Sequence, residues 1–170
     1  SLGVPEHSGA GLDARGITEA FPIQVATIGD ALAGKDLCGK APTGSGKTIA
    51  FGVPMVARVT RSKPKRPHGL VLTPTRELAI QVSEELASLS KDLRVLAVYG
   101  GAGIEPQIKK LRAGIDIVVA TPGRLLDLMD RNVAILTDVS FAVVDEADRM
   151  ADMGFLPDVR RILDLSLIHI

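Results

Sequence analysis

Short, almost continuous runs of apolar residues recur along the chain, and each is followed by a polar or Gly/Pro-rich corner and then usually by a helical pattern. Continuous apolarity predicts strands that are covered on both faces, which is typical of a parallel sheet with helices on both sides. We therefore predict a doubly wound α/β domain. The clearest predicted strands run from Leu70 to Thr73, Val95 to Tyr99, Ile115 to Ala120 and Phe141 to Asp145.

A further strand is predicted earlier in the chain, from Leu37 to Ala41. It contains Cys38, and we expect this thiol to be buried in the core rather than reactive. A helix-like run from Val25 to Leu32 precedes the strand, and a second helix is expected to begin at Lys47. Further upstream, Asp13 to Gly16 resembles the end of a weak helix.

The composition fits one aliphatic domain, because the 170 residues are 46% hydrophobic and only 3% aromatic. We assign residues 1–15 to an N-terminal segment, 16–165 to the domain and 166–170 to a tail. A single cysteine excludes an internal disulfide. We find no leader peptide and no apolar run long enough to span a membrane, which predicts a soluble, cytoplasmic protein.

Charge alone does not indicate a partner, because 20 basic residues balance 20 acidic ones. Nucleic-acid binding would have to come from local placement of Lys and Arg. The segment from Arg61 to His68 is a basic loop with two prolines. It could contact phosphates, but a solvated connection between elements is the favoured interpretation.

A glycine-rich turn separates the strand that ends at Ala41 from the helix that begins at Lys47. A turn in this context lets backbone N–H groups point inward at a polyphosphate, and the start of the helix adds its positive dipole end. Lys47 would reach the β/γ-phosphates and the Thr48 hydroxyl would coordinate Mg²⁺. Ala41 replaces the usual first glycine. The predicted phosphate loop comprises Ala41, Pro42, Thr43, Gly44, Ser45, Gly46, Lys47 and Thr48.

Two carboxylates follow the last predicted strand directly. Asp145 is placed to hold Mg²⁺, and Glu146 can polarise the water that attacks a γ-phosphate. Acidic residues at a strand end often serve only to solvate a loop. The phosphate loop on the same sheet edge favours the catalytic interpretation.

Three other corners also lie at carboxyl ends of predicted strands, where open α/β sheets bind ligands. Two of them, Thr73 to Ala79 and Thr121 to Arg124, combine Thr, Pro and Arg at a helix start and are candidate anion sites, although ordinary helix capping explains the same pattern. The third, Gly100 to Gly103, allows another chain to approach the backbone closely.

Gln24 lies shortly before the phosphate loop. Its amide could simply be solvent-exposed. It could also read adenine, because it offers an acceptor and a donor together.

In these motifs the chain resembles the DEAD-box RNA helicases, specifically the first of their two RecA-like domains. The resemblance extends from about residue 16 to about residue 165. It rests on six ordered motifs, namely Gly16 to Gln24 (Q motif), Ala41 to Thr48 (phosphate loop), Pro74 to Ala79 (Ia), Gly100-Gly101 (GG), Thr121 to Arg124 (Ib) and Asp145-Glu146-Ala147-Asp148.

The resemblance implies an ATP-dependent RNA helicase that uses ATP and Mg²⁺ and contacts RNA through its sugar-phosphate backbone, independently of sequence. It implies that Gln24 reads adenine and that Asp148 couples the two domains. The implied RNA-binding residues are Pro74, Thr75, Arg76, Gly100, Gly101, Thr121, Pro122, Gly123 and Arg124.

The chain also departs from the family pattern. Ala20 stands where the family usually has Pro, and the aromatic residue that normally stacks on adenine would fall ahead of Ser1. The Ser-Ala-Thr motif and the second RecA-like domain are absent, so we expect an incomplete domain that is poorly stable and nearly inactive alone. Two alternatives stay open: a non-catalytic RNA- or partner-binding module, and a DNA translocase with the same fold.

Overall fold

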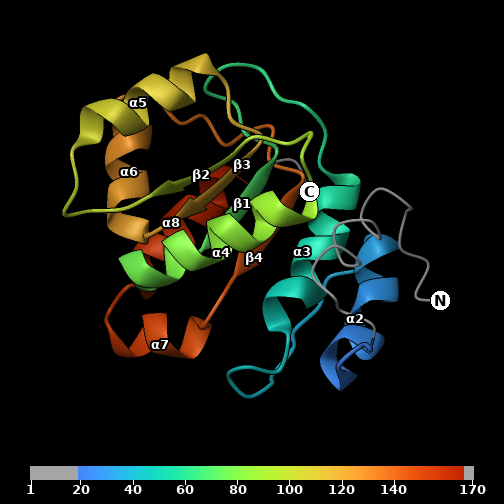
Figure 1. Ribbon diagram of the computed structural model, residues 1–170. Coiled ribbons are helices and arrows are strands. Elements are labelled where there is room, and N and C mark those ends of the chain that lie inside the picture. The colour runs from blue at the N-terminus through green and yellow to red at the C-terminus, as the bar shows by residue number, and fades with distance from the viewer. Residues whose placement is uncertain (1–18, 167–170) are drawn as a thin grey trace. The chain divides into compact units, whose positions relative to one another are not determined.

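The computed structural model describes residues 19–166 (Figure 1). The segment 1–15, its predicted weak helix and the tail after Ser166 lie outside this range. Among the described residues, none of the helices has the length and apolarity needed to cross a bilayer. The elements are α2 (Pro22–Leu32), α3 (Lys47–Arg58), β1 (Gly69–Leu72), α4 (Arg76–Leu89), β2 (Val95–Val98), α5 (Ile104–Ala113), β3 (Ile117–Ala120), α6 (Pro122–Asp130), β4 (Phe141–Val144), α7 (Ala147–Asp152) and α8 (Leu156–Ser166).

The chain divides into two compact units, Ser1–Arg58 with Glu85–Asp92 and Val59–Glu84 with Leu93–Ile170. The second unit contains a four-stranded parallel sheet in the order β2-β3-β1-β4. Every residue of β1 and β3 is buried, as expected for strands covered on both faces. The predicted parallel α/β sheet is therefore confirmed, with strand ends that differ from the prediction by at most two residues.

One face of the sheet packs against α5, α6 and α8. Strand residues such as Leu72 and Val118 belong to a buried cluster with Ile108 of α5, Leu125 of α6 and Ile162 of α8. Full burial of an aliphatic side chain of this size contributes about 1.5–3 kcal/mol. The cluster fixes the strands, and with them the corners at the strand ends.

The first unit is formed by α2, α3 and the last turn of α4. Its helices contact one another closely, because a Cβ added to Gly52 of α3 would lie 2.9 Å from Leu89 Cδ1 and 3.0 Å from Leu86 Cδ2. The helix predicted to begin at Lys47 does begin there. The run predicted from Val25 begins earlier, at Pro22, which occupies the first helical position that suits proline.

The predicted strand from Leu37 to Ala41 is wrong, because these residues form neither helix nor strand. Leu37 is 46% exposed, and Cys38 is exposed rather than buried. An apolar run becomes a strand only where a neighbouring strand accepts and donates its backbone hydrogen bonds. Within residues 19–166 no strand pairs with this segment.

Candidate active site

The four strand ends of the sheet lie at one edge, which we call the carboxyl edge. Leu72 is paired with both Ala120 and Val144, and Val98 is paired with Ala120. Backbone hydrogen bonds extend the ladder into the corners: Asp145 N–H donates to Leu72 O at 2.9 Å. Thr121 N–H donates to Val98 O at 3.0 Å.

This register brings together the predicted residues that follow the strands. Three strands of the sheet therefore contribute the Thr73, Thr121 and Asp145 corners side by side, and β2 adds the Gly100 corner next to β3. The carboxyl ends of parallel strands are where this class of fold binds ligands.

Arg76 lies over Tyr99, with its Cζ 4.9 Å from the ring centroid. The two residues come from different corners, so this cation–π contact joins the start of α4 to the end of β2. Gly101 is close by, since a Cβ added there would lie 3.9 Å from Arg76 Nη1, and its φ of +77° suits glycine. Tyr99, which makes this contact, was not among the predicted site residues. The sequence feature that could have identified it is an aromatic residue at a strand end, directly before the glycine corner.

Arg124 is held by the glycine corner rather than extended into solvent. Its two terminal nitrogens donate to Ala102 O at 3.1 and 3.0 Å, and Nη1 also donates to Gln107 Oε1 at 3.2 Å. Gln107 in turn donates from Nε2 to Tyr99 O at 3.2 Å. A planar guanidinium matches such a set of acceptors. Arg124 thus ties α6 to the Gly100–Gly103 corner, a role that the local pattern could not reveal.

Both predicted helix starts form, and their caps differ. Thr75 accepts a hydrogen bond at Oγ1 from Leu78 N–H at 3.3 Å, so it caps α4. Thr121 has the extended backbone of an N-cap residue, with Pro122 next to it, but its side chain makes no capping bond. The Thr121 hydroxyl therefore makes no hydrogen bond to the first N–H groups of α6.

Glu146 has a left-handed backbone, with φ 51° and ψ 49°, at the N-cap of α7. This conformation costs a non-glycine residue roughly 1–2 kcal/mol, and such strain concentrates at functional sites. Arg149 Nη1 donates to Glu146 Oε2 at 3.2 Å, with side-chain exposures of 54% and 25%. Asp148 is exposed in the first turn of the same helix. The acidic corner therefore presents carboxylates at the carboxyl edge.

The phosphate loop in the first unit has the predicted turn. Gly44 and Gly46 have φ of +78° and +79°, a region that glycine adopts without strain. Ser45 N–H donates to Pro42 O at 3.3 Å, and Ala50 N–H donates to Gly46 O at 3.0 Å as α3 begins. Pro42, Thr43 and Gly44 are exposed. The loop is thus a solvent-facing turn that leads into a helix N-terminus, which is a ready anion site.

Gln24 is 2% exposed, so the solvent-exposed interpretation of its amide is wrong. Its Oε1 accepts from Phe21 N–H at 3.0 Å, and its Nε2 donates to Gly46 O at 3.2 Å. A Cβ on Gly46 would collide with this Nε2 atom. The amide therefore joins the start of α2 to the phosphate loop, with one hydrogen bond at each of its two polar atoms.

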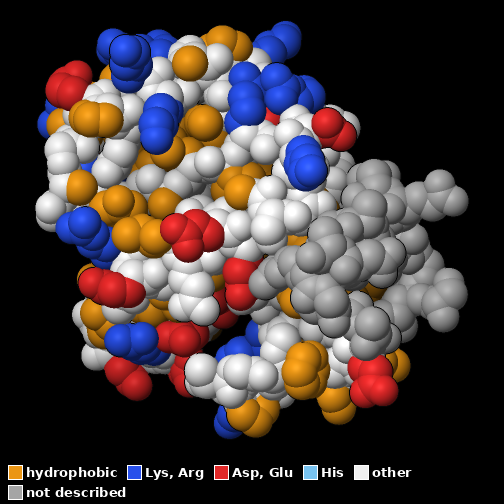
Figure 2. Space-filling view, viewed as in Figure 1, with side chains coloured by type: hydrophobic (Ala, Val, Ile, Leu, Met, Phe, Trp, Pro, Cys, Tyr) orange, Lys and Arg blue, Asp and Glu red, His pale blue; other side chains and the backbone are white. Residues whose placement is uncertain are grey.

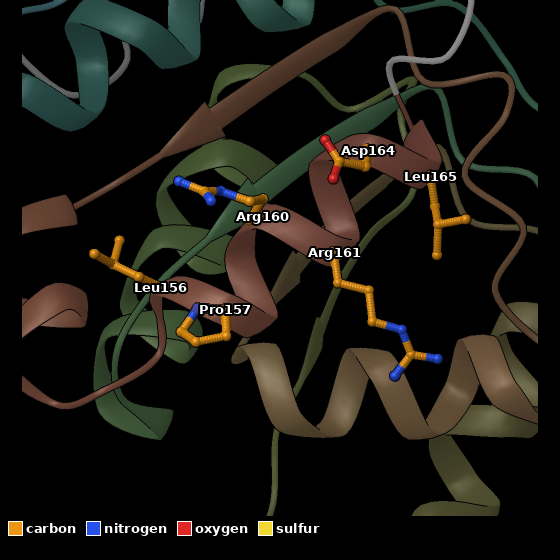
Figure 3. Close-up of a pocket in the computed structure, with 6 residues that line it drawn as sticks. All are labelled: Leu156, Pro157, Arg160, Arg161, Asp164 and Leu165. Atoms are coloured by element: carbon orange, nitrogen blue, oxygen red, sulfur yellow. The ribbon is translucent and has the colours of Figure 1, made fainter.

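A groove of about 660 Å³ runs along α8 in the second unit. Figure 3 shows its lining side chains, which are Leu156, Pro157, Arg160, Arg161, Asp164 and Leu165. All of them belong to one helix, and none is a predicted site residue.

Comparison with known proteins agrees with this architecture. The family model "DEAD/DEAH box helicase" matches residues 21–167. The chain is 45% identical over 168 residues to DEAD-box ATP-dependent RNA helicase 9 of Oryza sativa subsp. japonica, covering 96% of this chain and 27% of that protein. It is 50% identical over 164 residues to ATP-dependent RNA helicase CshA of Listeria monocytogenes, covering 95% of this chain and 31% of that protein.

A solved structure agrees as well. The crystal structure of a hypothetical ATP-dependent RNA helicase from Sulfolobus tokodaii superposes with a TM-score of 0.87 at 38% identity, over 95% of this chain and 47% of that one. The chain thus has the fold of a RecA-like helicase domain, and it spans less than half the length of these relatives. Family model, sequence identity and fold agree, and the chain belongs to the DEAD/DEAH box helicase family.

Proposed function

We propose that this chain is the ATP-binding domain of an RNA helicase, which binds ATP with Mg²⁺ and the RNA backbone and couples hydrolysis to local duplex unwinding. The main support is the carboxyl edge, where the acidic corner Asp145–Glu146 follows a strand that is paired directly with the strand before Thr73. Carboxylates that could hold a metal ion and corners that could bind phosphates come from separate motifs and lie at this one edge. An enzyme that hydrolyses a nucleotide while it binds a nucleic acid needs both kinds of group.

Nucleotide binding is assigned to the phosphate loop, residues 41–48. Its N–H groups and the start of α3 would receive the phosphates, and Lys47 would reach the β/γ-phosphates. Gln24 would read adenine with the second N–H and the second oxygen lone pair of its amide, since its hydrogen bonds to Phe21 and Gly46 use one of each.

Mg²⁺ fits the donors that the chain offers. Thr48 and Asp145 would supply hard oxygen ligands, and Mg²⁺ in phosphate-binding enzymes uses one or two such groups together with phosphates and water. The residues in the range 19–166 contain no cluster of three or more His, Cys, Asp or Glu that could enclose a metal alone. When bound, the ion would neutralise charge on the phosphates.

Glu146 is assigned the role of orienting and polarising the attacking water. Its left-handed backbone turns the chain sharply from β4 into α7, which supports a carboxylate displayed at the edge rather than one directed along the strand. Asp145, one residue earlier, would hold the metal. Arg149 pairs with Glu146 at 3.2 Å and would help to orient its carboxylate.

RNA contact is assigned to the remaining corners. They offer helix N-termini, glycine backbone and arginine, all of which contact phosphate and sugar and none of which reads a base edge. Sequence-independent binding follows. The 2′-hydroxyl is the group that would distinguish RNA from DNA. The assigned residues are Pro74, Thr75, Arg76, Gly100, Gly101, Thr121, Pro122, Gly123 and Arg124.

The work of unwinding would need a second RecA-like domain in the same protein. Support comes from the relatives, of which this chain covers 27% and 31%. Residues 16–165 would form the first domain, and Asp148 would couple it to the second. Arginine fingers from the second domain would complete the catalytic site, a contribution that can be worth on the order of 10³ or more in rate.

Unwinding of a short RNA duplex by the full-length protein tests this proposal. We expect strand separation that requires ATP and Mg²⁺ and that Lys47→Ala abolishes. A protein that binds RNA but separates no strands would be the non-catalytic module, and separation of DNA duplexes as readily as RNA would indicate a DNA translocase.

A further inference from the structure

A group of basic side chains lies at the amino edge of the sheet, the edge opposite the candidate site. We call it the basic surface. Figure 2 shows Lys and Arg gathered in the upper part of the view, over α5 and the segment between α3 and β1. The basic surface consists of Lys63, Lys65 and Arg66 from that segment and Lys110 and Arg112 from the last turn of α5.

The two parts of the basic surface are joined by the backbone. Lys65 N–H donates to Leu111 O at 2.9 Å, and Leu111 is flanked in sequence by Lys110 and Arg112. On the other side, Ile135 N–H donates to Lys65 O at 2.8 Å. The loop is therefore held beside the end of α5 by its backbone, while Lys63 and Pro64 stay exposed to solvent.

Lys65 itself has a left-handed backbone with φ of 64°. Within residues 19–166, the other non-glycine residues with positive φ are Asn132, a residue type common there, and Glu146 of the acidic corner. For a lysine this conformation is unfavourable and persists only where the surroundings impose it, which is a mark of functional segments.

A buried carboxylate fixes the start of the same segment. Asp116 is fully buried and accepts hydrogen bonds from Ser62 N–H at 2.7 Å and from Arg94 Nη2 at 2.7 Å. Arg94 Nη2 also donates to Ser62 O at 2.9 Å. The chain that carries Lys63 is thereby anchored at its first residues, so that little order would have to be gained when a ligand binds.

The basic surface carries excess positive charge, although the whole chain has none. Arg66 faces Asp138 at 3.5 Å. Within residues 19–166, no ion pair joins Lys63, Lys65, Lys110 or Arg112 to a carboxylate. The helix dipole of α5 favours cations at its last turn, but it does not account for the lysines of the neighbouring segment.

We propose that the basic surface binds the phosphodiester backbone of RNA, as a second contact apart from the carboxyl edge. The charges come from two separate elements rather than from one cavity, which suits a chain of regularly spaced phosphates better than a single small anion. Strands of four residues separate the two edges by about 13 Å, and an RNA strand must follow a longer path over the surface of the domain to contact both. A long RNA could therefore contact both edges, and an RNA shorter than that path could not. The inference rests on the proposed function in that the polyanion is RNA.

The test uses matched pairs of neutral substitutions in the full-length protein. Lys63→Gln with Lys110→Gln removes two charges from the basic surface, and Lys91→Gln with Arg160→Gln removes two exposed charges elsewhere. Fluorescence anisotropy over a range of salt concentrations measures binding of a single-stranded RNA much longer than about ten nucleotides. Turnover of ATP stimulated by a short RNA is measured in parallel.

We expect the first pair to lower the log–log salt slope for long RNA by about 1.4, since each lost phosphate contact on a single strand contributes about 0.7. Affinity for long RNA falls several-fold, while stimulation by short RNA and the melting temperature stay unchanged. The control pair leaves all of these values as in the parent. Lys65→Asn, which keeps the positive φ, is expected to lower the slope by about 0.7 on its own.

An unchanged slope for long RNA in both the pair and Lys65→Asn would overturn the inference and leave an acidic protein as the candidate partner of this surface. An equal loss of salt slope and affinity in the control pair would also overturn the inference, because removal of any two exposed positive charges would then weaken RNA binding. If the proposed function itself is wrong, the result is different: short RNA does not stimulate ATP turnover by the unsubstituted protein.

Discussion

Gln24 Nε2 donates to the carbonyl oxygen of Gly46 at 3.2 Å, which joins the start of α2 to the phosphate loop through one buried side chain. The other end of the same amide accepts from Phe21 N–H at 3.0 Å. One residue thus supports the loop in this structure and is assigned to adenine in the proposed function. The two roles can be separated by experiment.

Gln24→Ala should lower both stability and nucleotide selectivity. Loss of the two hydrogen bonds leaves Phe21 N–H and Gly46 O without this partner, at a cost of about 1–3 kcal/mol in the free energy of unfolding. Loss of the adenine contact should reduce the preference for ATP over GTP. Thermal melting and competition binding measure the two effects, with Gln81→Ala on the exposed face of α4 as the control. A variant that melts earlier but still prefers ATP as before would leave Gln24 with only the structural role.

Glu146→Gln should nearly abolish hydrolysis while nucleotide binding is retained. The amide keeps the shape of the side chain but loses the charge that polarises water, so we expect a fall in kcat on the order of 10² to 10³. Lys47→Ala should instead weaken binding itself. Equilibrium binding of a fluorescent ATP analogue, measured beside kcat, separates the two effects, and equal loss of binding in both variants would contradict this division of roles.

The buried carboxylate of Asp116 should make stability depend on pH in the acid range. Burial alone would raise the pKa of Asp116, but hydrogen bonds from Arg94 and Ser62 outweigh it and hold that pKa far below its usual range. The folded state therefore binds this proton less readily than the unfolded chain, whose Asp has a pKa of about 3.9. The contribution is fully present above pH of about 4 and is lost as the pH falls below that value.

Asp116→Asn should remove this pH dependence and lower the free energy of unfolding by roughly 3 kcal/mol, because Arg94 loses its charged partner. Urea unfolding at several pH values between neutral and acid measures both effects. Asp138→Asn is the matched control, since Asp138 is exposed and its pair with Arg66 should contribute less than about 1 kcal/mol. Equal losses in the two variants would show that burial of Asp116 is not the cause.

RNA affinity at the carboxyl edge should depend strongly on salt and little on sequence. Replacing Arg124 by Lys removes the forked contact to Ala102 and Gln107, so the glycine corner loosens, and RNA binding is expected to weaken several-fold for every sequence alike. Anisotropy with homopolymer RNAs at several salt concentrations measures this. A strong preference for one sequence that persists at high salt would contradict backbone recognition.

The sheet could be predicted from sequence because its signal is local. The strands β1 to β4 are continuous apolar runs, and each is followed by a corner of Thr, Pro, Gly or Asp that must lie at the carboxyl edge once the strands are parallel. The turn at the phosphate loop could likewise be predicted, because glycine adopts positive φ without strain. A cytoplasmic location stays a prediction of the sequence alone.

The errors involve partners that are distant in sequence. Leu37 to Ala41 looks like a strand locally, but pairing depends on a neighbouring strand, and none pairs with it within residues 19–166. Cys38 is exposed for the same reason. The contacts of Arg124 with Ala102 and of Gln24 with Gly46 each span 22 residues, and a local pattern contains no information about either.

The most direct test of the central claim is the steady-state rate of ATP hydrolysis by the full-length protein, measured without nucleic acid, with single-stranded RNA and with DNA of the same sequence. We predict that RNA raises the rate, that DNA does so far less, and that Glu146→Gln removes the RNA-stimulated rate while leaving RNA bound. A rate that RNA does not change, or that DNA raises equally, would contradict the account.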